Sequence, residues 1–167
     1  MNIFLIGFMG TGKSAVSKEL KALLPDHTEY DMDAEIVSRE GMPISEIFAQ
    51  KGEEYFRDAE TALLRELAAG DNAVISCGGG TVLREINRSI IKDKGLAVLL
   101  TAEPETVLKR TEGDTSRPLL KDRRDPDSIR ELMDAREEAY RSAADIVITT
   151  DDKDPGEIAG IIRSALL

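Results

Sequence analysis

The chain has one cysteine, one histidine and no apolar run that approaches the ~20 residues of a membrane span. Cys77 has no partner for an intrachain disulfide, so we expect a reducing compartment. His27 lies in a polar stretch after Pro25, which favours an exposed loop histidine over a catalytic one. The first residues lack the basic region of a secretory signal, and a glycine-rich segment interrupts their apolar run. These absences predict a cytoplasmic protein without a membrane partner.

Positive charge is also scarce. The 22 Lys and Arg residues are outnumbered by 32 Asp and Glu residues, which gives a formal net charge of −10. Such a charge opposes binding to nucleic acid and to anionic membranes, so neither is expected as a partner. Any anion site must therefore be built locally from clustered Arg and Lys. The 167 residues show no repeat or linker and suit one domain, 1–167, which we expect to be a monomer.

The most informative motif is the octapeptide Gly-Phe-Met-Gly-Thr-Gly-Lys-Ser at residues 7–14. It follows a short apolar run at 3–6 and precedes an amphipathic helical pattern, which is the context of a phosphate-binding loop. Glycines let backbone N–H groups turn toward a phosphate, Lys13 reaches the β and γ oxygens, and Ser14 offers a hydroxyl to Mg²⁺. The motif predicts a nucleoside triphosphate site with nucleotide contacts from Gly10, Thr11, Gly12, Lys13, Ser14 and Ala15.

Five apolar runs, at 3–6, 29–31, 73–76, 96–100 and 146–148, alternate with helical patterns. Alternation of this kind indicates parallel strands joined by right-handed crossovers. We therefore predict a three-layer α/β/α P-loop kinase fold with a five-stranded parallel sheet. Ligands of such sheets bind beyond the carboxyl ends of the strands.

One segment, 111–127, is polar, charged and irregular. A solvated surface loop is one interpretation. A mobile lid over about 111–126 is the other, because a phosphoryl-transfer site must exclude water.

Asp31 and Asp33 lie at the end of the second predicted strand run. Period-two alternation would send both carboxylates to one side, near the phosphate loop. One would hold Mg²⁺, and the other would orient an attacking hydroxyl or accept its proton. No acid follows the third strand, which favours Asp31 as the metal ligand beside Ser14. The alternative is that both carboxylates cap the next helix.

Three glycines, at 78–80, directly follow the third strand. A tight turn needs fewer, so we expect a close approach to the backbone by a ligand. Arg57 and Glu60 are three apart on a predicted helix and could form an ordinary surface ion pair. Arg136, on a predicted helix at 128–141, could equally be a solvated surface arginine.

Together these motifs resemble shikimate kinase over nearly the whole chain. The most specific part is the combination of Phe56-Arg57 with the triple glycine and Arg117-Pro118-Leu119-Leu120. The full set adds the phosphate loop, Asp31-x-Asp33, Gly41-x-x-Ile44-x-x-Ile47-Phe48, Gly52-Glu53-x-x-Phe56-Arg57-x-x-Glu60 and Arg136-x-x-x-Tyr140.

The resemblance implies ATP- and Mg²⁺-dependent phosphorylation of the 3-hydroxyl of shikimate. It implies that Arg57 and Arg136 bind the substrate carboxylate and that Asp33 binds the ring hydroxyls. Arg117 would reach the transferring phosphoryl group, so the implied catalytic residues are Lys13, Asp33 and Arg117. The remaining substrate contacts would come from Gly78, Gly79 and Gly80, and the adenine contacts from Arg110, Lys153 and Pro155.

Three positions depart from the family pattern: Thr11, Ala15 and Asp114. Ala15 lacks a hydroxyl near the phosphates, and Asp114 adds negative charge to the predicted lid. Other functions also remain open at this point. A kinase for another hydroxy acid such as gluconate would need the same arginines, and a nucleotide-binding module without turnover would keep the phosphate loop. A nucleoside monophosphate kinase is disfavoured because the sequence shows no pocket for a second base.

Overall fold

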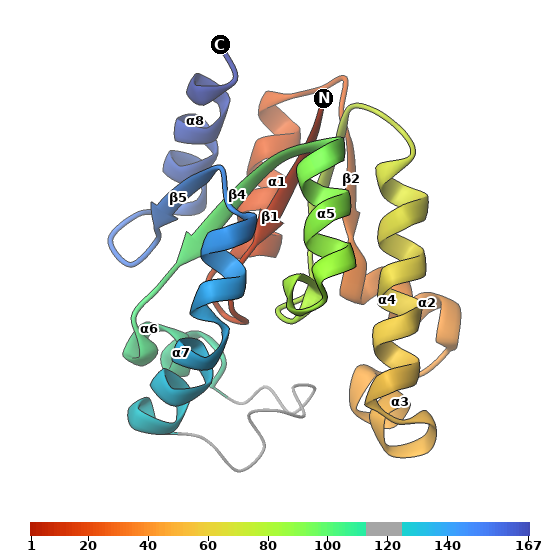
Figure 1. Cartoon of the computed structure of the whole chain (residues 1–167). Helices are drawn as coiled ribbons and strands as arrows, with labels where there is room; N and C mark the ends of the chain where they lie inside the picture. The colour runs from red at the N-terminus through yellow and green to blue at the C-terminus, as the bar shows by residue number, and fades with distance from the viewer. Residues whose placement is uncertain (113–124) are drawn as a thin grey trace.

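The computed structural model describes residues 1–112 and 125–167. Five parallel strands form one sheet in the order β2-β3-β1-β4-β5 (Figure 1). The strands are β1 (Asn2–Ile6), β2 (Thr28–Asp31), β3 (Ala73–Ser76), β4 (Gly95–Thr101) and β5 (Ile146–Thr149). Each predicted strand is thus present, and the predicted fold class is confirmed.

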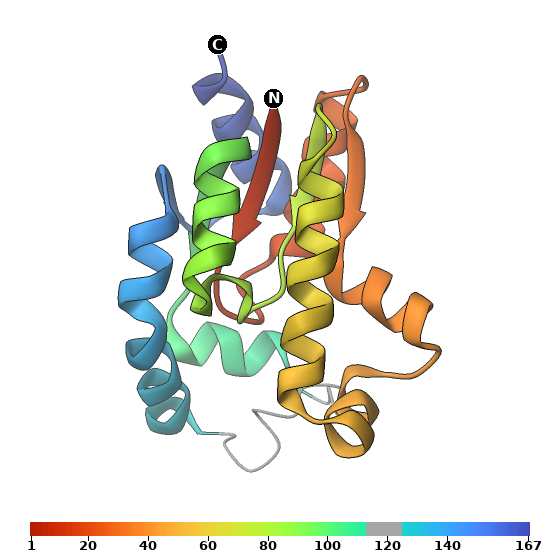
Figure 2. The ribbon, with the colours of Figure 1, turned by 45° about the vertical axis from the view of Figure 1, so that its right-hand side comes forward.

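The central strand β1 is buried on both faces because helices cover both sides of the sheet. Ile3 and Leu5 point toward one helical layer, made by α1 (Lys13–Leu23) and α8 (Pro155–Ala165). Phe4 and Ile6 point toward the opposite layer, made by α4 (Glu53–Ala68), α5 (Glu85–Lys94) and α7 (Pro126–Ala143). Figure 2 shows these three helices on the near side of the sheet. Alternate residues of β1 therefore pack into two separate hydrophobic cores, one on each face of the sheet.

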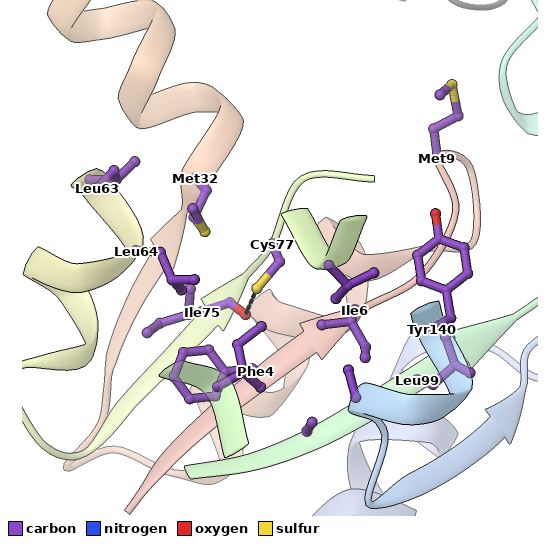
Figure 3. Packing of buried hydrophobic residues seen from close by; sticks show 14 of the residues in the cluster. Phe4, Ile6, Met9, Met32, Leu63, Leu64, Ile75, Cys77, Leu99 and Tyr140 are labelled. Atoms are coloured by element: carbon purple, nitrogen blue, oxygen red, sulfur yellow. Dashed lines mark hydrogen bonds between the residues drawn. The ribbon is translucent and has the colours of Figure 1, made fainter. Parts of the chain in front are cut away.

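The second of these cores extends from the sheet toward the loops that follow the strands. Figure 3 shows Phe4, Ile6 and Leu99 along one sheet face, with Cys77 and Tyr140 nearer the loops. The remaining elements lie around this end of the sheet. They are α2 (Met32–Glu40), α3 (Ile44–Lys51), α6 (Pro104–Arg110) and the 3₁₀ turn η1 (Thr81–Leu83).

One local expectation was wrong. Asp33 does not continue the alternation of β2, because α2 begins at Met32 and Asp33 lies in its first turn. Asp31 is the N-cap of this helix and accepts a hydrogen bond from the Ala34 N–H at 3.1 Å. A favoured cap residue therefore ends the strand two residues earlier than period-two alternation implied.

The predicted lid falls largely on residues 113–124, which lie outside the described residues, as do Asp114 and Arg117. Among the helices that the structure describes, none has the length and apolarity needed to cross a membrane.

Candidate active site

The functional residues gather beyond the carboxyl ends of β1, β2 and β3. A cavity of about 220 Å³ opens there. It is lined by Gly10 and residues 12–15 of the phosphate loop, by Asp31 and Asp33, by Ser76 and Cys77, and by Arg110. The structure thus brings together most of the predicted nucleotide and metal residues with the proposed proton acceptor.

The phosphate loop owes its shape to glycines with positive φ, 80° at Gly10 and 99° at Gly12. Residues other than glycine rarely adopt this backbone conformation. Gly10 also packs closely, since a Cβ there would lie 2.9 Å from Thr111 Cγ2. Lys13 is buried, and its Nζ donates hydrogen bonds to the carbonyls of Gly7 at 2.7 Å and Phe8 at 3.0 Å. The loop therefore holds the ammonium group at the cavity wall, where a phosphate would enter.

Ser14 and Asp31 face each other across the mouth of the cavity. Ser14 Oγ donates a hydrogen bond to Asp31 Oδ2 at 2.8 Å, while Asp31 Oδ1 caps α2. One oxygen of Asp31 therefore caps the helix, as the alternative interpretation expected for this residue, and the other faces Ser14, while its role as a metal ligand stays a prediction. Mg²⁺ in such sites takes one or two protein oxygens and completes its shell with waters and phosphates. This pair of oxygens fits Mg²⁺, although the described residues contain no cluster of three or more His, Cys, Asp or Glu suited to a metal.

The triple glycine makes room for side chains of the site itself. A Cβ on Gly80 would lie 2.5 Å from Arg57 Nη2, and one on Gly78 would lie 2.8 Å from both Asp33 Oδ1 and Glu60 Oε2. Groups of the protein therefore approach this backbone closely, and the expected contact with a ligand stays a prediction. A side chain at either position would displace the groups that line the site.

Arg57 and Glu60 form a buried ion pair, so the interpretation as a surface pair was wrong. Arg57 Nη1 lies 3.0 Å from Glu60 Oε1, and Glu60 is only 1% exposed. Thr81 Oγ1 donates to Glu60 Oε2 at 2.8 Å. Burial raises the pKa of Glu60, against the lowering effect of the Arg57 charge and the Thr81 hydroxyl. Sequence reasoning missed the burial of Glu60, although its place beside the apolar stripe of α4 was a signal.

Arg136 is likewise buried, which overturns its interpretation as a solvated residue. Its guanidinium carbon lies 5.8 Å from the centre of the Phe8 ring. Its Nη1 has no hydrogen-bond partner among the described residues, although a Cβ on Gly79 would come within 3.8 Å of it. One turn along α7, the Tyr140 hydroxyl donates to the Gly79 carbonyl at 2.5 Å. Buried polar groups are nearly always satisfied, so this cation is suited to an anionic ligand.

The residues expected at the adenine lie on the other side of the phosphate loop. Arg110 Nη1 donates to the Gly10 carbonyl at 3.3 Å and to Thr150 Oγ1 at 3.0 Å. Lys153 Nζ donates to the Thr149 carbonyl at 3.1 Å, and Pro155 begins α8. Arg110 reaches the cavity, whereas Lys153 and Pro155 do not line it.

Comparison with known proteins adds independent information. A family model described as shikimate kinase matches residues 9–166. The shikimate kinase of Geobacter sulfurreducens is 45% identical over 152 residues, which cover 91% of this chain and 83% of that protein.

Solved structures give the same family. The shikimate kinase of Acinetobacter baumannii, solved in complex with shikimate, superposes with a TM-score of 0.94 at 35% identity and covers 99% of this chain and 92% of that one. The shikimate kinase of Aquifex aeolicus gives a TM-score of 0.82 at 38% identity and covers 99% of this chain and 96% of that one.

Proposed function

Because the chain belongs to the shikimate kinase family, we propose that its site phosphorylates the 3-hydroxyl of shikimate with ATP as the donor. The family relation makes the chain an ATP-dependent phosphotransferase that acts on shikimate. It favours shikimate over gluconate and argues against a nucleotide-binding module without turnover. The geometry of the site and the family pattern support the following roles for single residues.

The phosphate loop binds the triphosphate of ATP. Backbone N–H groups from Gly10 to Ala15 surround the phosphates, and the Lys13 ammonium neutralises the charge that shifts between the β and γ oxygens. Ser14 and Asp31 would hold Mg²⁺, which supplies positive charge against the phosphates when it is bound. Arg110, with Lys153 and Pro155 beyond it, flanks the base.

Asp33 orients the attacking hydroxyl and accepts its proton. Its carboxylate lines the cavity beside Lys13, and Gly78 leaves room for it. A carboxylate in this position can accept the proton as the bond to phosphorus forms. The family pattern assigns Arg117, outside the described residues, to the charge on the transferring phosphoryl group.

Arg57 and Arg136 hold the substrate carboxylate beside Gly79 and Gly80. Both guanidinium groups lie against the triple glycine, although they come from helices on opposite sides of it. Planar guanidinium groups bind carboxylates bidentately, which suits them to a small anionic acid.

The observation that carries this proposal is the buried Nη1 of Arg136, which has no partner among the described residues. It provides local positive charge that a protein of net charge −10 needs in order to bind an anion. We also propose a cytoplasmic monomer. The single, buried cysteine and the use of ATP support the first point, and the scattered large apolar side chains on the described surface support the second.

The test is ADP release by the purified protein with Mg²⁺-ATP and a panel of hydroxy acids that includes shikimate, quinate and gluconate. We expect turnover with shikimate and little with the other acids. Binding of ATP without turnover on any acid would contradict the proposed activity.

A further inference from the structure

Thr150, the residue after β5, joins three segments of the nucleotide half of the site through one side chain. It is 1% exposed. Its Oγ1 lies 3.1 Å from the Thr11 carbonyl of the phosphate loop and 3.0 Å from the Thr101 carbonyl at the end of β4. The same oxygen lies 3.0 Å from Arg110 Nη1. No sequence motif had singled this residue out.

The chemistry of a hydroxyl fixes the direction of these contacts. A threonine hydroxyl has one proton to donate and two lone pairs that accept. Arg110 can only donate, so Oγ1 must be the acceptor in that bond. The proton must then go to one of the two carbonyls, which turns a lone pair toward the guanidinium. Arg110 Nη2 also donates to the Thr150 carbonyl at 3.1 Å, so residue 150 binds the guanidinium with both of its oxygens.

Neighbouring contacts hold the helix that carries Arg110 in the same way. Asp151 Oδ1 accepts from the Glu103 N–H at 2.9 Å and from Thr106 Oγ1 at 2.6 Å, at the start of α6. Thr150 acts at the other end of α6, through Arg110. The junction of β5 with its following loop therefore anchors α6 at both ends, against the phosphate loop.

We propose that Thr150 is a positioning residue for the nucleotide, acting through Arg110. Its hydroxyl holds the Arg110 guanidinium against the Gly10 carbonyl, so that the exposed face of the arginine is fixed before the nucleotide binds. Thr150 is buried beneath this contact and does not itself line the cavity. This inference rests on the proposed function, because it needs ATP to bind at the phosphate loop.

The test compares Thr150→Val, which keeps the shape and removes the hydroxyl, with Thr150→Ser, which keeps the hydroxyl. Dissociation constants for Mg²⁺-ATP and for shikimate are measured separately by calorimetry. We expect Thr150→Val to weaken ATP binding about 10-fold or more, since a bond to a charged group is lost. Shikimate binding should stay within about 2-fold, and Thr150→Ser should restore ATP binding.

The matched control is Thr149→Val. This neighbouring threonine is exposed, and its hydroxyl contacts only Thr101 Oγ1, at 3.4 Å, among the hydrogen bonds of the described residues. The Thr149→Val protein should bind both Mg²⁺-ATP and shikimate as tightly as the unaltered protein does. In an Arg110→Ala background, Thr150→Val should lose most of its effect on ATP binding, because the group it positions is gone.

Three results would overturn the inference. Thr150→Val could leave the affinity for ATP unchanged, or it could weaken shikimate binding as much as ATP binding. It could also weaken ATP binding in the Arg110→Ala background as much as it does in the unaltered protein. If Thr150→Val loses affinity for both ligands to the same extent and also melts at a lower temperature, the role of Thr150 is purely structural. Failure of the unaltered protein to bind Mg²⁺-ATP would instead contradict the proposed function, so the two failures are distinguishable.

Discussion

At the scale of single residues, the two buried arginines of the site differ in how their charges are satisfied. Arg57 is paired with Glu60 at 3.0 Å, whereas Arg136 Nη1 has no partner in the described part of the chain. Leaving a buried donor unsatisfied costs free energy until a ligand supplies an acceptor. Arg136 should therefore contribute at least as much as Arg57 to binding of the substrate carboxylate.

Arg57→Ala and Arg136→Ala should each weaken shikimate binding by roughly 10- to 150-fold, because each removes a hydrogen bond to a charged group. ATP binding should barely change. The sharper measurement uses an analogue in which a carboxamide replaces the carboxylate. It should bind poorly to the unaltered protein and lose little further affinity in either variant. Equal binding of amide and acid would exclude both arginines from the carboxylate site.

Asp33→Asn should lower kcat by roughly 10²- to 10⁴-fold, the range typical of general-base assistance. Asparagine keeps the shape of the side chain but cannot accept the proton. The Kd of Mg²⁺-ATP, measured in parallel, should change little. A loss confined to ATP affinity would make Asp33 a metal ligand instead, and Asp31→Asn provides the comparison for that outcome.

At the scale of elements, the loop between β3 and η1 is a spacer that fits between α4, α7 and the phosphate loop. Each of its glycines faces a different neighbour: Gly78 faces Asp33 and Glu60, Gly79 faces the Met9 backbone and Arg136, and Gly80 faces Arg57. Their small size, more than their backbone freedom, is what the site uses, because none of the three has a positive φ.

Gly80→Ala should therefore displace the Arg57 guanidinium and weaken shikimate binding while leaving ATP binding nearly unchanged. The control is Gly160→Ala in α8, where an added Cβ meets nothing within 4 Å. That change should raise stability by roughly 0.4–1 kcal/mol, since alanine restricts the unfolded chain. Affinities for both ligands and melting temperatures of the two variants give the comparison. Unaltered shikimate affinity in Gly80→Ala would show that Arg57 does not need its observed position.

At the scale of the whole molecule, the order of the strands makes the site a product of distant segments. β1 lies at the centre of the sheet and pairs with β3 and β4, so the first residues of the chain are ordered only when the later ones have folded. A sheet connected in this way should unfold as one cooperative unit.

Thermal or denaturant unfolding should accordingly show a single transition that coincides for far-UV circular dichroism and for tyrosine fluorescence. Shikimate at about 100 times its Kd should raise the free energy of unfolding by about 2.7 kcal/mol, because it binds only the folded chain. Quinate or gluconate at the same concentration serves as the control. Two separate transitions would contradict the single domain, and an equal shift with every acid would contradict selective binding.

The strands, the phosphate loop and the family can be predicted from the sequence, because each depends on local pattern. Short runs of three to five residues marked all five strands, and the glycines with Lys13 and Ser14 marked the loop. The sequence also placed Asp31 beside Ser14 by position alone. Local periodicity failed at Asp33, where the capping preference of Asp31 began a helix.

Only the tertiary structure decided which charged groups are buried. Taken alone, the pattern of Arg57, Glu60 and Arg136 is that of ordinary surface residues on amphipathic helices, and only the family resemblance assigned the two arginines to a site. Helical spacing indicates which residues share a face but not what covers that face. The triple glycine brings these side chains together by leaving space for them. Thr150 was undetectable for the same reason: its three partners come from the phosphate loop, β4 and α6, and a hydroxyl acquires its role only when folding brings such segments around it.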